Sequence, residues 1–187
     1  PLILSLSKLQ KELKVVVPKN SSEKISMIPN IKVYEVNHLN EAIDFFKYKN
    51  YEQKRVKNRD LDCEVLEISN KKYFYNKEYT LNFLDVKGQK LAKNAALISA
   101  CGNHNILFEG SPGCGKSMIV KRLQYIMPPM SMDDILEKAK LDCIDMKIPD
   151  FKPTCVFRNP HHSSTRSSIF GGGSRDSKIG EVALANK

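Results

Sequence analysis

Apolar residues in the first fifty positions follow strand spacing and helix spacing in turn. Two short apolar runs, at 13–17 and 31–36, have the length and composition of buried strands, and Pro18 ends the first run. A third apolar set has the i, i+3, i+4, i+7 spacing of an amphipathic helix: Leu39, Ala42, Ile43 and Phe46. These patterns predict alternating α and β elements.

Two further helices are predicted beside these strands. Four apolar residues suit one face of a short helix at the beginning of the chain: Leu2, Ile3, Leu6 and Leu9. Asn20 followed by Glu23 resembles a capping box and predicts a helix to about Ile28. Residues 1–48 therefore look like a small α/β segment that is too short to hold a good core alone.

Residues 49–81 show little periodicity, and we interpret them as a linker. Cations crowd this stretch and its N-terminal edge: Lys47, Lys49, Lys54, Arg55, Lys57 and Arg59. Aromatic residues follow: Tyr73, Phe74, Tyr75 and Tyr79. A basic and aromatic segment can bind nucleic acid by stacking on bases. We favour a solvated linker whose aromatics pack on a neighbouring domain, because charge runs usually mark solvated segments.

From residue 82 onward the pattern predicts a helix, a strand and two more helices. Residues 89–101 have helical periodicity that stops at Gly102, and one face carries Leu91, Ala95 and Ile98. A short buried strand is predicted at 105–109 and a helix at 118–125.

The remaining chain begins with a helix and then becomes rich in loop residues. Ser131 with Asp134 predicts a helix start, and this helix runs to about Lys140. The loop-rich tail extends from Phe151, and residues 181–184 have a strand-like composition.

A phosphate-binding loop lies between the predicted strand at 105–109 and a helix that begins at about residue 116. It comprises Gly110, Ser111, Pro112, Gly113, Cys114, Gly115, Lys116 and Ser117. Its glycines let the backbone N–H groups point at a β-phosphate, and the positive end of the helix faces the same anion. Lys116 supplies a cation for the β- and γ-phosphates, and the Ser117 hydroxyl is a hard ligand for Mg²⁺. The sequence therefore predicts an ATP site with Mg²⁺.

The Cys114 thiol within this loop could be activated at a helix N-terminus. The favoured interpretation is that the position merely tolerates a small side chain.

Composition and charge add little to this picture. The 187 residues are 41% hydrophobic and 27% charged, as in ordinary globular proteins, and the net charge of +9 suits a polyanionic partner without proving one. Five scattered cysteines without a CxxC pair indicate reduced thiols, and no signal peptide or membrane span is recognisable. We expect a cytoplasmic protein.

Four stretches resemble the magnesium-chelatase-like branch of the AAA+ ATPases, and within it the ComM/YifB family. They are residues 85–89, which look like the beginning of the helix before the P-loop, the PheArg-x-ProHisHis run at 157–163, and the GlyGlyGly and GlyGlu elements at 171–174 and 180–185. These elements occur together and in order, and the resemblance covers nearly the whole chain.

The resemblance implies an α/β fold in three parts. Residues 1–48 are the C-terminal part of a Lon-protease-like domain, 49–81 the linker, and 82–187 the N-terminal part of an AAA+ domain. It implies a hexameric ring ATPase that remodels DNA as a branch-migration helicase in natural transformation and recombination. We expect an internal fragment that stops before the Walker B acids, the sensors and the arginine finger. No catalytic residue is therefore assigned, and no meaningful ATP turnover is expected from the fragment.

The same resemblance implies a basic, glycine-rich hairpin facing the ring's central channel, where cations could touch a DNA backbone. The DNA candidates are Arg166, Arg175 and Lys178. His161 and His162 are adjacent and point apart on most backbones, so a zinc site is disfavoured against a loop near the pore or the subunit boundary.

Three alternative functions stay open. One is a magnesium chelatase motor subunit that works on protein partners rather than DNA. Another is an ATP-dependent protease or chaperone, although no catalytic Ser–Lys pair can be placed in residues 1–48. The last is a nucleotide-binding module that does not hydrolyse ATP.

Overall fold

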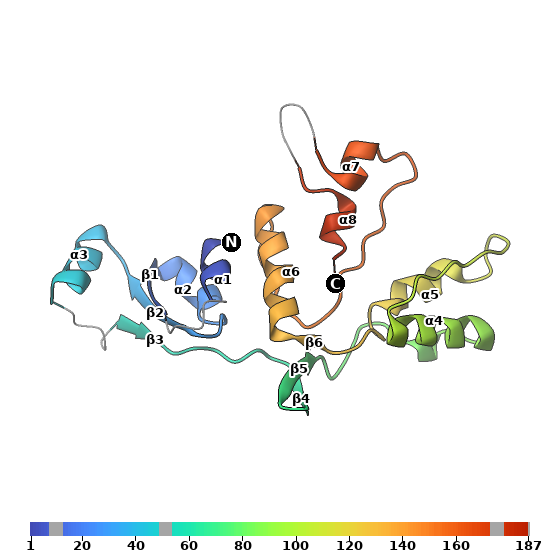
Figure 1. The fold of residues 1–187 in the computed structure, drawn as a ribbon, viewed down its shortest axis with the longest axis horizontal. Helices are drawn as coiled ribbons and strands as arrows, with labels where there is room; N and C mark the ends of the chain where they lie inside the picture. The colour runs from blue at the N-terminus through green and yellow to red at the C-terminus, as the bar shows by residue number, and fades with distance from the viewer. Residues whose placement is uncertain (8–12, 49–53, 173–177, 187) are drawn as a thin grey trace.

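The computed structural model describes residues 1–7, 13–48, 54–172 and 178–186 (Figure 1). Within these ranges the elements, in chain order, are α1 (Leu2–Leu6), β1 (Leu13–Pro18), α2 (Lys19–Ile25), β2 (Ile31–Val36), α3 (Leu39–Tyr48), β3 (Arg55–Val56), β4 (Glu64–Ile68), β5 (Lys71–Tyr75), the 3-10 turn η2 (Phe83–Asp85), α4 (Lys90–Gly102), α5 (Lys116–Leu123), β6 (Met130–Ser131), α6 (Met132–Ile144), α7 (Arg166–Phe170) and α8 (Glu181–Leu184). No helix among these residues is long and apolar enough to cross a membrane.

The first sheet confirms both N-terminal strands. β1 and β2 are parallel, with Val15 opposite Val33, and β3 adds an antiparallel strand at the β2 edge. Helices α2 and α3 pack on this sheet. Helix α3 confirms the predicted helix, but three of the four residues of its predicted apolar face are exposed and Phe45 is buried instead. Leu9 of the predicted first helix lies outside the described residues.

The predicted start of α2 is wrong. Helix α2 begins at Lys19, directly after Pro18, and no side chain caps its first turn. Pro18 ends the strand and is the N-cap residue of α2, where its φ is −60° and it has no N–H to leave unsatisfied. Glu23 forms an ion pair with Arg59 instead of closing a capping box.

Residues 49–81 contain more regular structure than a linker would. β4 and β5 form a hairpin whose register sets Glu64 opposite Tyr75, and β5 also pairs with β6. Phe74 packs against the largest hydrophobic cluster, which fits the interpretation that aromatics of this stretch pack on a neighbouring part of the chain. Both domain boundaries, at 48/49 and 81/82, remain predictions.

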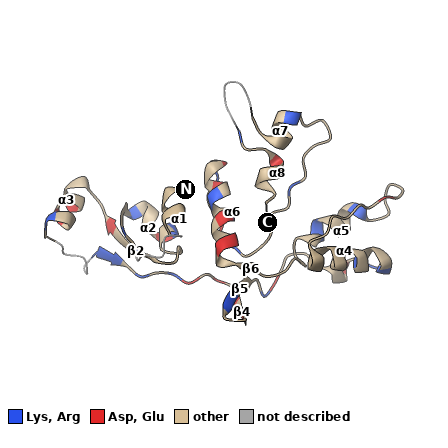
Figure 2. Cartoon of the chain, in the orientation of Figure 1, with Lys and Arg blue, Asp and Glu red and all other residues tan. Residues whose placement is uncertain are grey.

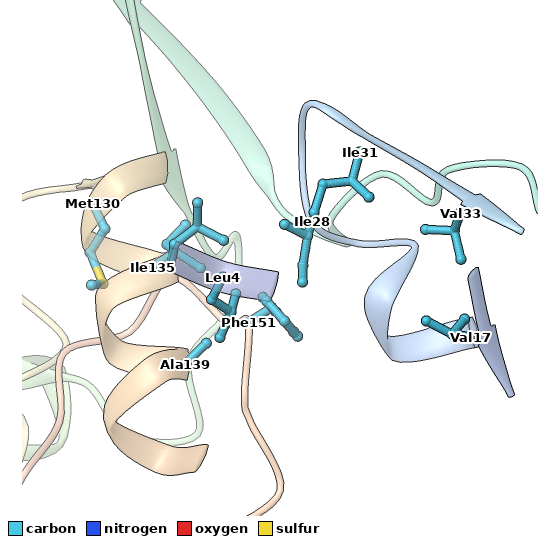
Figure 3. Packing of buried hydrophobic residues seen from close by; sticks show 10 residues of the cluster. Leu4, Val17, Ile28, Ile31, Val33, Met130, Ile135, Ala139 and Phe151 are labelled. Carbon is cyan, nitrogen blue, oxygen red and sulfur yellow. The ribbon is translucent and has the colours of Figure 1, made fainter. Parts of the chain in front are cut away.

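The largest hydrophobic cluster joins the N-terminal sheet to α6 (Figure 3). Its buried members are Leu4, Val17, Ile28, Ile31, Val33, Met130, Ile135, Leu136, Ala139 and Phe151. Figure 1 shows α6 standing beside α1, and the two helices are in contact. The small N-terminal α/β segment thus obtains part of its core from residues a hundred positions later in the chain, as its size requires.

Helix α6 begins as predicted and extends further. The Ser131 hydroxyl accepts from the Asp134 N–H at 3.2 Å, while the Asp134 carboxylate accepts from the Ser131 N–H at 3.1 Å, which completes a capping box. The helix ends at Ile144 rather than near Lys140. Its buried Lys138 ammonium donates to the carbonyls of Lys152 and Thr154 at 2.7 and 3.2 Å, and these bonds tie the following loop to the helix.

A second, smaller cluster holds α4 against α5. Its buried residues are Val86, Ala96 and Ile119. The predicted helix at 89–101 is confirmed within one residue, but its leucine-bearing face is solvent-exposed, with Leu91 86% exposed. The small residues Ala96, Ser99 and Ala100 face inward instead, because a close approach of two helices favours short side chains. The last residue of the helix is Gly102, and the left-handed residue that caps it is Asn103, at φ 51°.

Two predicted strands are wrong. Residues 104–110 form no regular element and pair with no described strand, since an apolar run alone supplies no ladder partner. The run is also not fully buried, because Phe108 packs in the second cluster while Leu107 is 88% exposed. Residues 181–184 form helix α8, in which the Leu184 N–H donates to the Gly180 carbonyl at 3.1 Å.

We predict that Lys138→Ala lowers the free energy of unfolding by about 1–3 kcal/mol, because two inward carbonyls lose their donor. Urea titration measures this, with Lys140→Ala on the same helix as the matched control. Equal unfolding free energies for both variants would show that the Lys138 bonds do not hold the loop.

Candidate functional site

The P-loop has the backbone that its glycines were expected to permit. Gly110, Gly113 and Gly115 have φ of 154°, 81° and 90°, values that side-chain-bearing residues rarely adopt. A Cβ on Gly110 would stand 3.1 Å from the Cys114 Sγ, so this position is also tightly packed. Helix α5 begins at Lys116, directly after Gly115, and its N-terminus therefore faces the loop as predicted.

Lys116 bends back over its own loop. Its Nζ donates to the carbonyls of Gly110 and Ser111 at 2.6 and 2.8 Å and lies 3.4 Å from the Cys114 Sγ. Ser117 follows on the exposed first turn of α5. The loop therefore brings together the glycine backbone, the cation and the hydroxyl that a Mg²⁺–triphosphate group would need.

Arg122 fastens the P-loop helix to the segment before α4. This buried side chain donates to the Asn82 and Met118 carbonyls at 2.8 and 3.1 Å and forms a salt bridge with Asp85 at 3.1 Å. Hydrogen bonds from the Asn82 N–H and then from Arg122 lower the pKa of Asp85. Arg122 was not identified from the sequence. The one signal in the sequence is a cation at a position on the buried side of the predicted helix.

Residues 85–89 are not the beginning of a helix. Asp85 closes a capping box with Asn82 around η2, and Gly88 and Gln89 then have positive φ of 65° and 50° before α4 starts. The Gln89 side chain donates to the Cys114 carbonyl at 3.3 Å. The stretch that carries the family resemblance thus contacts the P-loop directly, which the sequence alone did not reveal.

The segment after α6, residues 157–187, is called the excursion below, and an ion pair joins its two ends. Arg158 forms two hydrogen bonds with the Glu181 carboxylate, at 2.6 and 2.7 Å, and these lower the pKa of Glu181. A Cβ on Gly180 would lie 2.3 Å from the Gly171 nitrogen, so the two backbones cross where only glycine fits. The PheArg and GlyGlu elements are therefore structural partners across the excursion.

Two of the three DNA candidates lie near this crossing. Gly172 and Lys178 form an antiparallel bridge, and exposed Arg166 begins α7, where Figure 2 shows a blue segment. Arg175 lies outside the described residues, as do Gly173 and Ser174.

The two histidines stack on each other and do not form a metal site. The ring centroids of His161 and His162 are 4.0 Å apart, and His161 Nδ1 lies 2.7 Å from the Ser163 hydroxyl. Among the described residues, no group of three or more His, Cys, Asp or Glu side chains could hold a metal ion.

Two open cavities lie elsewhere. One of about 690 Å³ lies between α4, α5 and α8, and one of about 930 Å³ lies between the 59–64 segment and the loop after α6. Neither includes the P-loop, which is exposed. A polyphosphate needs an exposed nest of N–H groups more than an apolar cavity, so the glycine geometry defines the candidate site.

The family described as magnesium chelatase, subunit ChlI, matches residues 82–187, and the chain belongs to this family. It is a ComM/YifB-like, magnesium-chelatase-related protein of the AAA+ class. It is 31% identical to the competence protein ComM of Haemophilus influenzae over 99% of this chain and 34% of that protein. It is 37% identical to the uncharacterized protein YifB of Salmonella typhimurium over 57% of this chain and 21% of that protein. The chain thus spans about a third of the length of ComM.

We predict that the Arg158–Glu181 pair makes stability depend on pH. The folded pKa of Glu181 is below its ordinary value of 4.5, so the ionised pair stabilises the fold above that pH. Its contribution is lost as the pH falls through the lowered pKa. Glu181→Gln should therefore unfold at lower urea than the wild type at neutral pH and match it in acid.

The matched control is Glu78→Gln, which replaces an exposed carboxylate. A gap between wild type and Glu181→Gln that persists unchanged in acid would contradict the role of the ion pair.

Proposed function

We propose that residues 110–117 bind the phosphates of ATP together with Mg²⁺, as the ATP-binding part of a ring-forming AAA+ ATPase. The observation that carries this proposal is the P-loop backbone, with three positive-φ glycines leading into α5. The loop N–H groups and Lys116 would hold the phosphates, and the Ser117 hydroxyl would be a Mg²⁺ ligand. The bound Mg²⁺ would neutralise phosphate charge.

Lys116→Ala is expected to weaken ATP binding by at least about tenfold, because it removes a charge-assisted contact to phosphate. Isothermal calorimetry with a non-hydrolysable ATP analogue and Mg²⁺ measures this. Lys121→Ala, an exposed lysine further along the same helix, is the matched control. The site assignment fails if both variants bind the analogue as the wild type does.

We further propose that the complete protein uses this ATPase to remodel DNA, as a hexameric branch-migration helicase in natural transformation and recombination. The similarity to a protein named for competence supports this. The bridge between Gly172 and Lys178 supports a hairpin at which cations could touch phosphates. The Lon-like assignment of residues 1–48 belongs to the same proposal.

The rival site for DNA is the group of cations in the 49–81 segment. One of its members is already engaged, because Lys54 donates to Glu41 at 2.9 Å and lowers the pKa of that carboxyl to about 2. Arg59 is also paired, with Glu23. These carboxylates neutralise part of the basic surface of the 49–81 segment. We therefore favour the excursion as the DNA-binding surface.

A chelatase motor is the second candidate, and the name of the matched family favours it. Such a motor would act on protein partners and would need no DNA contact. The two candidates therefore differ in whether cations of the excursion affect DNA binding.

Replacing Arg166, Arg175 and Lys178 together by alanine is expected to weaken DNA binding by the full-length protein. Loss of three phosphate contacts should also flatten the slope of log K against log salt by about 2–3. Fluorescence anisotropy of a labelled forked DNA at several salt concentrations measures both quantities, and calorimetry checks that ATP-analogue binding is retained.

The matched variant replaces Lys54, Arg55 and Lys57 by alanine. If that variant loses DNA and the excursion variant does not, the excursion is the wrong surface. If the full-length protein without these substitutions does not bind DNA, the chelatase candidate takes precedence.

A further inference from the structure

The β4–β5 hairpin presents a free, apolar strand edge. All five residues of β4 are exposed, and its three aliphatic side chains, Val65, Leu66 and Ile68, are 51%, 41% and 52% exposed. Among the described strands, β4 pairs only with β5, so its other edge has no partner. Figure 1 shows the hairpin projecting at the lower edge of the view. An edge of this kind is a template for another strand.

The turn determines which backbone groups face outward. Ser69 and Asn70 form a two-residue connection with φ of 50° and 62°, the signature of a type I′ turn. Ile68 and Lys71, which flank it, then exchange hydrogen bonds, and the pairs alternate from there. The N–H and C=O groups of Val65 and Glu67 therefore point away from β5, toward the free edge.

The free edge is complementary to itself. When a second copy of β4 lies antiparallel with Leu66 opposite Leu66, Val65 of each copy faces Glu67 of the other. These are the residues whose backbone groups point outward, so both pairs can exchange two hydrogen bonds. The whole length of β4 is paired in this register.

Charge favours this register over its neighbours. Glu64 comes opposite Ile68, and Glu67 opposite Val65, so no like charges meet. Centring the pair on Glu64 or on Glu67 would place two carboxylates face to face, and centring it on Val65 or Ile68 would shorten the overlap. On one face, the row across the joined strands reads Tyr73, Leu66, Leu66, Tyr73.

A polyanion fits this edge poorly. β4 carries two glutamates and no cation, and Lys72 of β5 lies directly opposite Glu67. The aromatic side chains of β5, which could stack on bases, are half-buried. These features oppose a nucleic-acid surface at the hairpin and favour an added strand.

We propose that β4 is a contact surface for a second copy of this chain, which pairs edge to edge about a two-fold axis at Leu66. The two hairpins then form one four-stranded sheet in the order β5, β4, β4, β5. Two five-residue strands make a contact below the roughly 1,200–2,000 Å² of stable interfaces, so a single pair associates weakly. A two-fold contact cannot join neighbours within a cyclic ring, so in ring assemblies it would link one ring to another, and several such contacts would then add through effective concentration. This surface is independent of ATP and of the P-loop.

Disulfide trapping tests the register in the 187-residue chain, after Cys63→Ser and Cys101→Ser remove two native thiols. Leu66→Cys should crosslink to itself under mild oxidation, because residues at a non-hydrogen-bonded pair have Cα atoms about 4.5 Å apart, within disulfide range. Ile68→Cys is the matched control on the same face. Its two copies would be about 14 Å apart along the strands, given about 3.4 Å per residue.

Sedimentation of the unmodified chain over a range of concentrations should show reversible dimers. Leu66→Lys should weaken their association constant by about tenfold, because two ammonium groups would meet on the axis. Equal crosslinking of both cysteine variants indicates non-specific aggregation and overturns the proposal. So does crosslinking of neither, or DNA binding that depends on Lys71 and Lys72 without any self-association.

Discussion

The fold depends on one shared hydrophobic cluster. Leu4 and Ile28 come from the N-terminal α/β segment, while Ile135 and Phe151 come from α6 and the loop that follows it. Forty-odd residues cannot exclude enough apolar surface from water to be stable alone. Helix α6 supplies the missing side, and its capping box and the buried Lys138 hold it and its following loop in the required place. The N-terminal segment and the α6 region are therefore coupled by burial, whatever boundary is drawn between domains.

The P-loop depends on polar contacts more than on that core. Only a small cluster around Val86, Ala96 and Ile119 supports α4 and α5. Arg122 compensates by binding Asn82 and Asp85, so hydrogen bonds join the backbone before α4 to the helix after the P-loop. Gln89 adds a contact to the loop itself.

The sequence predicted the elements whose signals are local. The P-loop, the capping box of α6 and the strands β1 and β2 each follow from a few neighbouring residues. Two of the errors arose where a distant partner decides. Residues 105–109 are an apolar run that lacks a strand beside it, and the helix at 181–184 is held by Arg158, more than twenty positions earlier. The start of α2 was a local error, because Pro18 stands before Lys19. The sequence indicated Gly180 only as part of a resemblance. The structure shows why a glycine is needed there, because two backbones cross at this residue. The β4–β5 hairpin was missed because β4 is exposed along its whole length and has no buried face to create a pattern.

Lys116 is hydrogen-bonded to its own loop, and a nucleotide would have to replace these bonds. Its ammonium is bound to the carbonyls of Gly110 and Ser111, so the loop meets the lysine's need for acceptors from its own backbone. Phosphate oxygens are stronger acceptors for a cation than neutral carbonyls, because the bond joins two opposite charges. Both carbonyls belong to exposed residues and can exchange the lysine for water. In the proposed ATP complex the lysine would turn to the phosphates at small cost, while the positive-φ glycines already hold the loop in its curve. On this proposal charge, rather than a rearrangement of the fold, would select the ligand at the loop.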